Sequence, residues 1–384
     1  MQPFEGDTQT GIQPRGPRVR SLGKGQEAHI VMGNLYLRQR QYDKAMLEFE
    51  SALRLKPDSA VAHFSLGNVH LRQKRLAEAR ACYQDALKFN PQHAGAHFCL
   101  GLISLQEKNS AEATGFFQEA LRLNPDQPMV RFALGNLHMG QRQYGEAVSE
   151  LRAALRLKPQ FLAGFFRLGR AHSAQGDEQE AIEAYREGAR LNPRLAMPRL
   201  QLGHLLAKAG RHEEAAEEFR AAIGMRPKLL LAHLRLGDAL LESGRLEEAE
   251  AAYREAARLR PNRAMVHLRF GNLRLAQGRI EEAVGCYEET LRHNRHLAEA
   301  HRRLGNARFA LGGMDAAAAC YAEALRINPK LAMAHVDQGD LHAARGARAM
   351  AESEYRKALE LDPKLEMARV RLEGLKGAAG TVRG

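Results

Sequence analysis

The chain has 384 residues, 45% of them hydrophobic and none of them tryptophan, and a formal net charge of +12. No stretch approaches the roughly 18 consecutive apolar residues of a membrane-spanning helix, and the first 25 residues lack the apolar run of a secretory signal. Four cysteines in no C-x-x-C spacing exclude a disulfide scaffold. We therefore expect a cytoplasmic protein without a transmembrane segment.

Residues 1–25 combine three prolines and five glycines with four basic and two acidic side chains. Such a composition buries too little apolar surface to offset the cost of ordering the backbone. It predicts a disordered, mildly basic arm, which is either an inert tail or an arm that docks onto a partner or touches lipid.

From Gln26 onward, a 34-residue pattern recurs ten times without insertion or deletion. With Gln26 as position 1, every repeat has glycine at position 8 and alanine at position 20. A fixed period of this length is typical of a solenoid. The predicted repeats span residues 26–59, 60–93, 94–127, 128–161, 162–195, 196–229, 230–263, 264–297, 298–331 and 332–365.

Each repeat is predicted to form two amphipathic helices. Positions 3, 4, 7, 8 and 11 share one helical face, and positions 3, 7 and 8 are apolar or small in nearly every repeat. The apolar or small residues at positions 20, 24 and 27 likewise share one face of the second helix. Glycine inside a helix costs about 1 kcal/mol relative to alanine, so its recurrence at position 8 indicates close packing beside the Tyr or Phe at position 24. After the last repeat, residues 366–377 are predicted to form a capping helix and residues 378–384 a flexible tail.

In the seventh repeat the pattern consists of Leu236-Gly237 in the first helix, then Ala249, Tyr253, Ala256 and Pro261. This pattern resembles the tetratricopeptide repeat (TPR) family over residues 26 to about 365. The resemblance implies an all-α fold, a right-handed α–α superhelix (TPR solenoid) with a C-terminal capping helix, whose concave wall is formed by the first helices. Local departures include Leu151 at the aromatic position and Arg295 at the proline position, and the latter makes the junction between repeats eight and nine irregular.

Catalytic motifs are not apparent in the sequence. His212-Glu213-Glu214 lacks the second histidine of a zinc-protease motif, and there is neither a phosphate-binding glycine loop nor a nucleophile elbow. Seven histidines recur at position 4, where the 34-residue step separates them by one repeat width. We therefore predict no enzymatic activity, no cofactor and no metal site; a metal at His293, His296 and His301 is a minor alternative.

Positions 2, 5, 6, 9 and 13 form a second stripe on each first helix, which we name the first-helix wall. At position 5, four successive repeats carry an apolar row: Phe64, Phe98, Phe132 and Phe166. These rings form either shallow pockets for a partner's apolar side chains or part of the packing between neighbouring helices.

Two polar rows follow on the same wall. The arginines at position 6 suit carboxylate recognition, although a solvated face is equally consistent: Arg167, Arg235, Arg269 and Arg303. The asparagines at position 9 each offer a donor and an acceptor to an extended peptide backbone: Asn34, Asn68, Asn136, Asn272 and Asn306.

The sequence thus predicts a protein–protein interaction adaptor or scaffold that binds an extended or helical segment of a partner protein along the concave face. The expected partner carries apolar and acidic residues. The alternatives are a self-assembling scaffold, with the chain itself a monomer or weak homo-oligomer, and a nucleic-acid-binding repeat protein. Nucleic acid is disfavoured because basic and acidic residues alternate on the same helices, with no basic run interleaved with aromatic residues.

Overall fold

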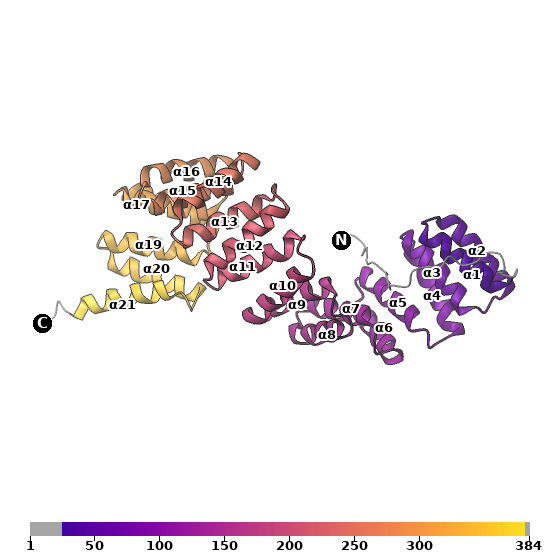
Figure 1. Ribbon diagram of the computed structural model, residues 1–384. Coiled ribbons are helices and arrows are strands. Elements are labelled where there is room, and N and C mark those ends of the chain that lie inside the picture. The colour runs from indigo at the N-terminus through magenta and orange to yellow at the C-terminus, as the bar shows by residue number, and fades with distance from the viewer. Residues whose placement is uncertain (1–24, 381–384) are drawn as a thin grey trace. The chain divides into compact units, whose positions relative to one another are not determined.

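The computed structural model describes the backbone of residues 25–380 and the side chains of residues 25–375. All regular elements in this part of the chain are α-helices (Figure 1). The first helices of the repeats are α1 (Gln26–Arg38), α3 (Ala60–Arg72), α5 (Ala94–Gln106), α7 (Pro128–Gly140), α9 (Leu162–Gln175), α11 (Ala196–Lys208), α13 (Leu230–Glu242), α15 (Ala264–Ala276), α17 (Ala298–Ala310) and α19 (Ala332–Ala344). The second helices are α2 (Tyr42–Leu55), α4 (Leu76–Phe89), α6 (Ser110–Leu123), α8 (Tyr144–Leu157), α10 (Glu178–Leu191), α12 (His212–Met225), α14 (Leu246–Leu259), α16 (Ile280–His293), α18 (Met314–Ile327) and α20 (Arg348–Leu361).

The helix after the last repeat, α21 (Glu366–Gly380), extends past the predicted end at residue 377. Of the predicted N-terminal arm, residues 1–24 lie outside the described residues, as do residues 381–384 of the predicted tail. The helices form two compact units, residues 1–176 with α1–α9 and residues 177–384 with α10–α21. The boundary between these units falls inside the fifth repeat.

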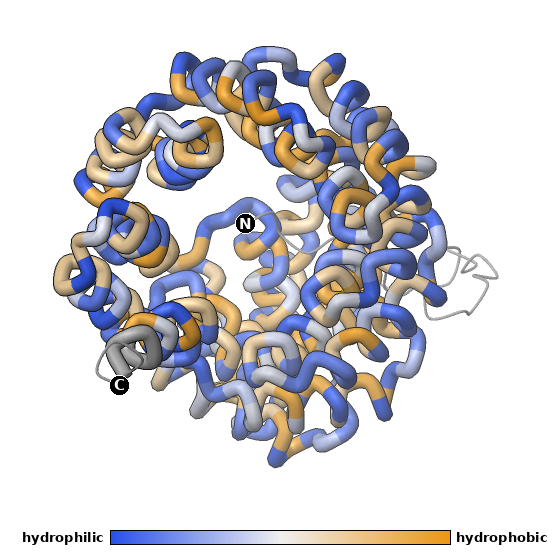
Figure 2. The backbone as a smooth tube through the Cα atoms, turned by 90° about the vertical axis from the view of Figure 1, so that its left-hand side faces the viewer, coloured by the Kyte–Doolittle hydropathy of each residue, from blue (hydrophilic) through white to orange (hydrophobic). Residues whose placement is uncertain are grey.

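The core of each unit is built from repeat-sized layers. Alanine at position 20 is fully buried in every repeat, and so are most of the aromatic rings at position 24. Figure 2 shows hydrophobic and hydrophilic residues alternating along each helix, without one central apolar mass. This distribution is typical of a solenoid, in which each repeat is covered by its neighbours.

The recurring glycine has the packing role that the sequence predicts. A Cβ atom placed on Gly271 would lie 2.3 Å from Cε1 of Tyr287, whose ring is fully buried. The same relation holds between Gly33 and Phe49 at 2.5 Å and, in the fourth repeat, between Gly135 and Leu151 Cγ at 2.8 Å. In these repeats the first helix therefore approaches the second so closely that only glycine fits at position 8.

Histidine at position 4 stabilises the connection between repeats. The ring Nε2 of His233 donates to the carbonyl oxygen of Pro227, the residue at position 32 of the preceding repeat, at 2.8 Å. Histidines in five further repeats make the same bond at 2.9–3.2 Å: His63, His97, His267, His301 and His335. The bond from His301 to the Arg295 carbonyl shows that the junction between repeats eight and nine keeps the common geometry without a proline.

The turn inside each repeat explains why the sequence changes at position 15. In the first four repeats, Arg40, Lys74, Lys108 and Arg142 adopt φ values of 59–63°, in the left-handed region. In the last six repeats, glycines occupy this position with φ values of 73–98°. A side chain in this conformation costs about 1 kcal/mol relative to glycine, so the N-terminal four repeats carry strain that the others lack.

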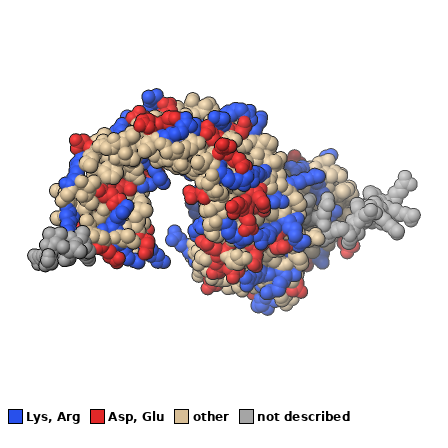
Figure 3. All heavy atoms as spheres, turned by 60° about the vertical axis from the view of Figure 1, so that its left-hand side comes forward, with Lys and Arg blue, Asp and Glu red and all other residues tan. Residues whose placement is uncertain are grey.

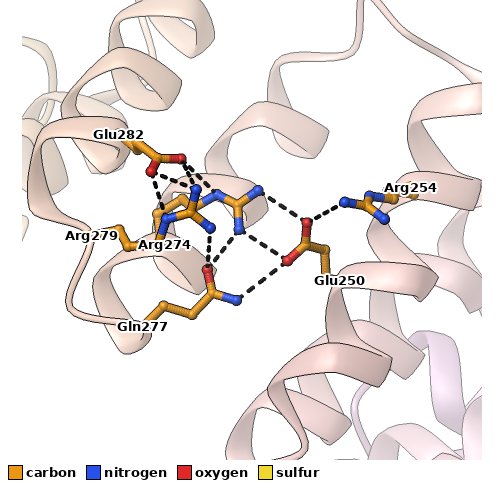
Figure 4. A network of polar contacts seen from close by, with 6 residues as sticks. All are labelled: Glu250, Arg254, Arg274, Gln277, Arg279 and Glu282. Carbon is orange, nitrogen blue, oxygen red and sulfur yellow. Dashed lines mark hydrogen bonds and ion pairs between the residues drawn. The ribbon is translucent and has the colours of Figure 1, made fainter.

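A polar network joins the seventh and eighth repeats (Figure 4). Glu250 of α14 accepts two hydrogen bonds from the Arg274 guanidinium of α15, at 3.0 and 3.1 Å, and a third from Gln277 at 3.3 Å. The side chains of Glu250 and Arg274 are only 15% and 14% exposed. These hydrogen bonds from Arg274 lower the pKa of Glu250 to about 2.

Because the pKa of Glu250 is lower in the folded than in the unfolded chain, its contribution to stability is complete above pH about 4.3 and is lost as the pH falls through about 2. Replacing Glu250 with glutamine should cost about 1 kcal/mol at pH 7, and the difference from the native chain should shrink toward pH 2. Urea unfolding of both proteins at pH 7, 4 and 2 measures this difference in the free energy of unfolding. Glu255→Gln, which removes an exposed pair with Arg258 on the same helix, is the control and should show little effect.

Candidate partner-binding wall

Within each unit the first helices lie on the tighter side of the stack. First helices of neighbouring repeats contact one another directly, for example α13 with α15 and α17 with α19. Among the described residues, neighbouring second helices make no contacts of comparable extent. The first helices therefore form the inner side of each stack, which is where the sequence placed the candidate site.

The phenylalanine rings at position 5 are more deeply buried than rings that line shallow binding pockets would be. Phe132 is only 2% exposed and packs edge-on against Phe161, with ring centroids 4.7 Å apart. Phe64 and Phe98 are half-buried against Tyr83 and Phe117 of their own repeats, and Phe166 is half-buried as well. For Phe132 this burial favours the second interpretation, in which the ring is part of the packing between neighbouring helices.

The arginines at position 6 in the C-terminal unit lie beside carboxylates of the same chain. Arg269 Nε is 2.5 Å from Asp238 Oδ1, and Arg235 approaches the same carboxylate at 3.7 Å. Arg303 pairs with Glu299 at 2.8 Å. In the capping helix, Arg371 pairs with Asp340 at 3.1 Å. These ion pairs neutralise part of the positive row that the sequence suggested for acidic ligands, since Arg235 and Arg269 share one carboxylate.

Most polar side chains at position 9 are held by a tyrosine of the same repeat. The hydroxyl of Tyr287 donates to Asn272 Oδ1 at 2.9 Å. Equivalent bonds at 2.7–2.9 Å connect Tyr83 with Asn68, Tyr253 with Asp238, and Tyr355 with Asp340. In the ninth repeat the direction is reversed, because the Asn306 amide nitrogen donates to the Tyr321 hydroxyl at 2.8 Å. Burial raises the pKa of these tyrosines, so their hydroxyls remain donors at neutral pH. In Asn68 and Asn272, this bond uses the amide oxygen and leaves the Nδ2 donor without a partner among the described residues.

The hydrogen bond between the tyrosine at position 24 and the side chain at position 9 was not predicted. The sequence carries a signal for it, because position 9 is Asn or Asp in five of the six repeats with tyrosine at position 24. Two asparagines at position 9 lie in repeats that have no tyrosine at position 24. Asn34 is opposite Phe49, and Asn136 is opposite Leu151, neither of which has a hydroxyl. The Oδ1 atom of Asn136 is buried without a hydrogen-bond partner.

Replacing Leu151 with tyrosine should therefore give Asn136 Oδ1 its missing donor. We expect the Leu151→Tyr variant to be more stable than Leu151→Phe by about 1 kcal/mol, the net value of one buried hydrogen bond. The phenylalanine variant has the same ring and so controls for packing. Denaturant unfolding of the two variants measures the difference, and equal stabilities would contradict the assignment.

The ninth repeat interrupts the wall with a buried charged cluster. Arg302 at position 5 is 5% exposed and binds two carboxylates, Glu299 at 2.6 Å and Asp337 at 2.8 Å. The Asn306 amide, with its oxygen and nitrogen exchanged, also donates to Asp337 at 3.2 Å. Arg302 and Asn306 thus both hold the internal carboxylate of Asp337.

Position 2 was placed on the wall by the helical spacing, but its residues were not considered as binding residues. It is apolar in most repeats and well exposed in several, with Val61 at 52%, Met197 at 41% and Leu231 at 46%. Unlike the phenylalanines at position 5, these side chains extend beyond the packed layers. The recurrence of large apolar residues at position 2 is the sequence feature from which this exposed row could have been predicted.

No group of three or more His, Cys, Asp or Glu side chains in the described part of the chain is arranged to hold a metal ion. The four cysteines are free, and burial raises the pKa of Cys82 and of Cys99 to about 11, which keeps both thiols protonated. Basic and acidic side chains are interleaved over the face shown in Figure 3. Among residues 25–380, no helix has both the length and the apolar character needed to cross a membrane.

Comparison with solved structures finds similar helical repeats. A tetratricopeptide repeat protein from Parabacteroides merdae is 16% identical, with a TM-score of 0.60, over 65% of this chain and 98% of that chain. Yeast Tom70 is 13% identical, with a TM-score of 0.53, over 93% of this chain and 96% of that chain. A chain in the structure of the Cut9–Hcn1 hetero-tetramer is 12% identical, with a TM-score of 0.50, over 91% of this chain and 96% of that chain. None of the curated proteins matches the chain significantly.

Family models match nearly the whole repeat region. Tetratricopeptide repeat models match residues 30–94, 77–128 and 130–161. A model described as the Cilia and flagella-associated protein 70 C-terminal domain matches residues 162–373, more than half of the chain. None of these models describes a catalytic domain. The chain therefore belongs to the tetratricopeptide repeat family, and its residues 162–373 belong to the Cilia and flagella-associated protein 70 C-terminal domain family.

Proposed function

We propose that this interaction scaffold binds a segment of another protein along the first-helix wall of one of its units. Membership of the tetratricopeptide repeat family makes the chain a protein-interaction scaffold in general terms. The observation that supports the finer proposal is the composition of the wall. Exposed apolar side chains at position 2 stand beside polar side chains at positions 6 and 9, which are held in place by neighbours within the chain.

This arrangement favours recognition over a purely structural role. The ion pairs and tyrosine bonds fix the polar side chains before a ligand arrives, which reduces the entropy lost on binding. The large apolar side chains at position 2 supply the buried area that affinity requires. Among the structures with a similar fold, Cut9 was crystallised in a hetero-tetramer with Hcn1.

Capture experiments with three forms of the full chain test the proposal. The wall variant carries Leu231→Glu and Arg235→Glu on α13. The control carries Met350→Glu and Arg258→Glu, two comparable changes at exposed sites on the second helices α20 and α14. We expect a partner that binds the native chain and the control to be lost from the wall variant. Equal capture by all three forms would reject the wall as the binding surface.

Self-association is a second candidate, because α21 exposes two apolar side chains. Met367 and Val370 are 48% and 56% exposed, whereas the apolar residues at position 5 in the repeats are buried or half-buried. Light scattering at rising protein concentration, with Val370→Glu for comparison, tests this candidate. A constant monomer mass for both forms would reject it.

A further inference from the structure

Position 2 of the first helices carries a regular row of flexible apolar side chains. Five of the twelve methionines occupy this one position: Met129, Met197, Met265, Met333 and Met367. Leu231 continues the row between Met197 and Met265, so that α11, α13 and α15 carry three successive apolar side chains. Met197 and Leu231 are exposed, and Met265 is half-buried against the core beneath α15. Methionine is flexible and polarisable, which suits a surface that adapts to varied apolar side chains.

The charges around this row do not favour an acidic ligand. In the same stretch of wall, Arg235 and Arg269 both lie at the carboxylate of Asp238. Farther along, Arg303 pairs with Glu299, which replaces the apolar residue at position 2 in the ninth repeat. Arg235 and Arg269 share one carboxylate, so an acidic segment would compete with Asp238 for them, whereas an uncharged segment leaves the ion pairs intact.

The spacing of the row limits the conformation of the ligand. Neighbouring packed helices are about 8–10 Å apart, and an extended chain of the polyproline II type advances about 3.1 Å per residue with three residues per turn, so every third side chain lies on the same side and faces the next helix. An α-helix advances about 10.5 Å in seven residues, but its backbone groups bond internally. The unused Nδ2 donor of Asn272 on α15 instead suits the free carbonyl groups of an extended chain.

We propose that α11, α13 and α15 bind an extended, non-acidic partner segment with an apolar side chain at every third residue. The inference rests on the proposed function and specifies the chemistry of its ligand. Met197, Leu231 and Met265 contact the apolar side chains, and Asn272 donates to the backbone of the segment. From the sequence we expected acidic residues in the partner; here we propose a non-acidic segment instead.

Fluorescence anisotropy with labelled peptides tests the proposal on the full chain. The first peptide has 12 residues with leucine at every third position, separated by serine and proline. The second contains the same residues rearranged so that the leucines alternate with other residues, and the third has glutamate in place of serine. We expect the first peptide to bind at least tenfold more tightly than the other two.

Variants then connect binding to the row. Met197→Gln combined with Leu231→Gln should weaken binding of the first peptide at least tenfold, and Met350→Gln, an exposed methionine on the second helix α20, should leave it unchanged. Equal binding of the three peptides, a tighter glutamate peptide or an equal effect of Met350→Gln would overturn the inference. If none of the peptides binds but the wall variant still loses a captured partner, the inference fails while the proposed function stands. Equal capture by all forms rejects both.

Discussion

Replacing Gly271 with alanine is expected to lower the free energy of unfolding by about 2 kcal/mol. The new methyl group would lie 2.3 Å from Cε1 and 2.8 Å from Cζ of Tyr287, whose ring is fully buried and cannot move aside. Overpacking of this kind costs about 1–3 kcal/mol or more, which exceeds the roughly 1 kcal/mol that alanine gains over glycine in a helix. Urea unfolding followed by circular dichroism measures the change.

Gly285 provides a matched control within the same repeat. It lies inside α16, is exposed, and a Cβ atom there would meet nothing within 4 Å. Gly285→Ala should therefore stabilise the chain by about 0.5–1 kcal/mol. The two substitutions are chemically identical and should have opposite signs. A stabilising Gly271→Ala would contradict the close approach of α15 and α16.

Removing the carboxylate of Asp337 should produce the second large effect. Asp337→Ala leaves the Arg302 guanidinium, only 5% exposed, with Glu299 as its remaining partner. Removing one member of a buried pair typically costs about 3–5 kcal/mol, and because Glu299 remains we expect about 2–3 kcal/mol. Burial raises the pKa of Asp337, although Arg302 opposes this, so the carboxylate depends on its partner to remain ionised.

The double variant Arg302→Leu and Asp337→Asn tests the interpretation. Leucine is the residue at position 5 in repeats six to eight, so it restores the apolar packing of those repeats. We expect the double variant to unfold within about 1 kcal/mol of the native chain, because both charges are removed together. If it is as unstable as Asp337→Ala, the unpaired charge is not the cause of the loss.

Much of the fold was predictable because it depends on short-range spacing. Glycine at position 8, alanine at position 20 and the ring at position 24 determine how two helices of one repeat pack, and all three recur in register. The start of α11 at Ala196 and of α13 at Leu230 coincides with the start of the corresponding predicted repeats. The division into two compact units at Gly176 depends on contacts that the repeat pattern alone does not specify.

The wall was harder to predict because positions 2 and 5 are only three residues apart on one helix. The angle between successive repeats decides which of them is covered, and helical spacing does not reveal that angle. Phe132 is consequently buried, whereas Leu231 is exposed. The ion pair between Arg269 and Asp238 spans two repeats, so inspection of single repeats did not reveal it.

Photo-cross-linking from single positions tests the location of the binding surface most directly. A photoreactive amino acid is placed at position 231 on α13 in one form of the full chain and at position 350 on α20 in another, and each is irradiated with a captured partner. We expect a covalent adduct with the partner from position 231 and none from position 350. An adduct from position 350 alone would place the partner on the second helices and contradict the proposed function.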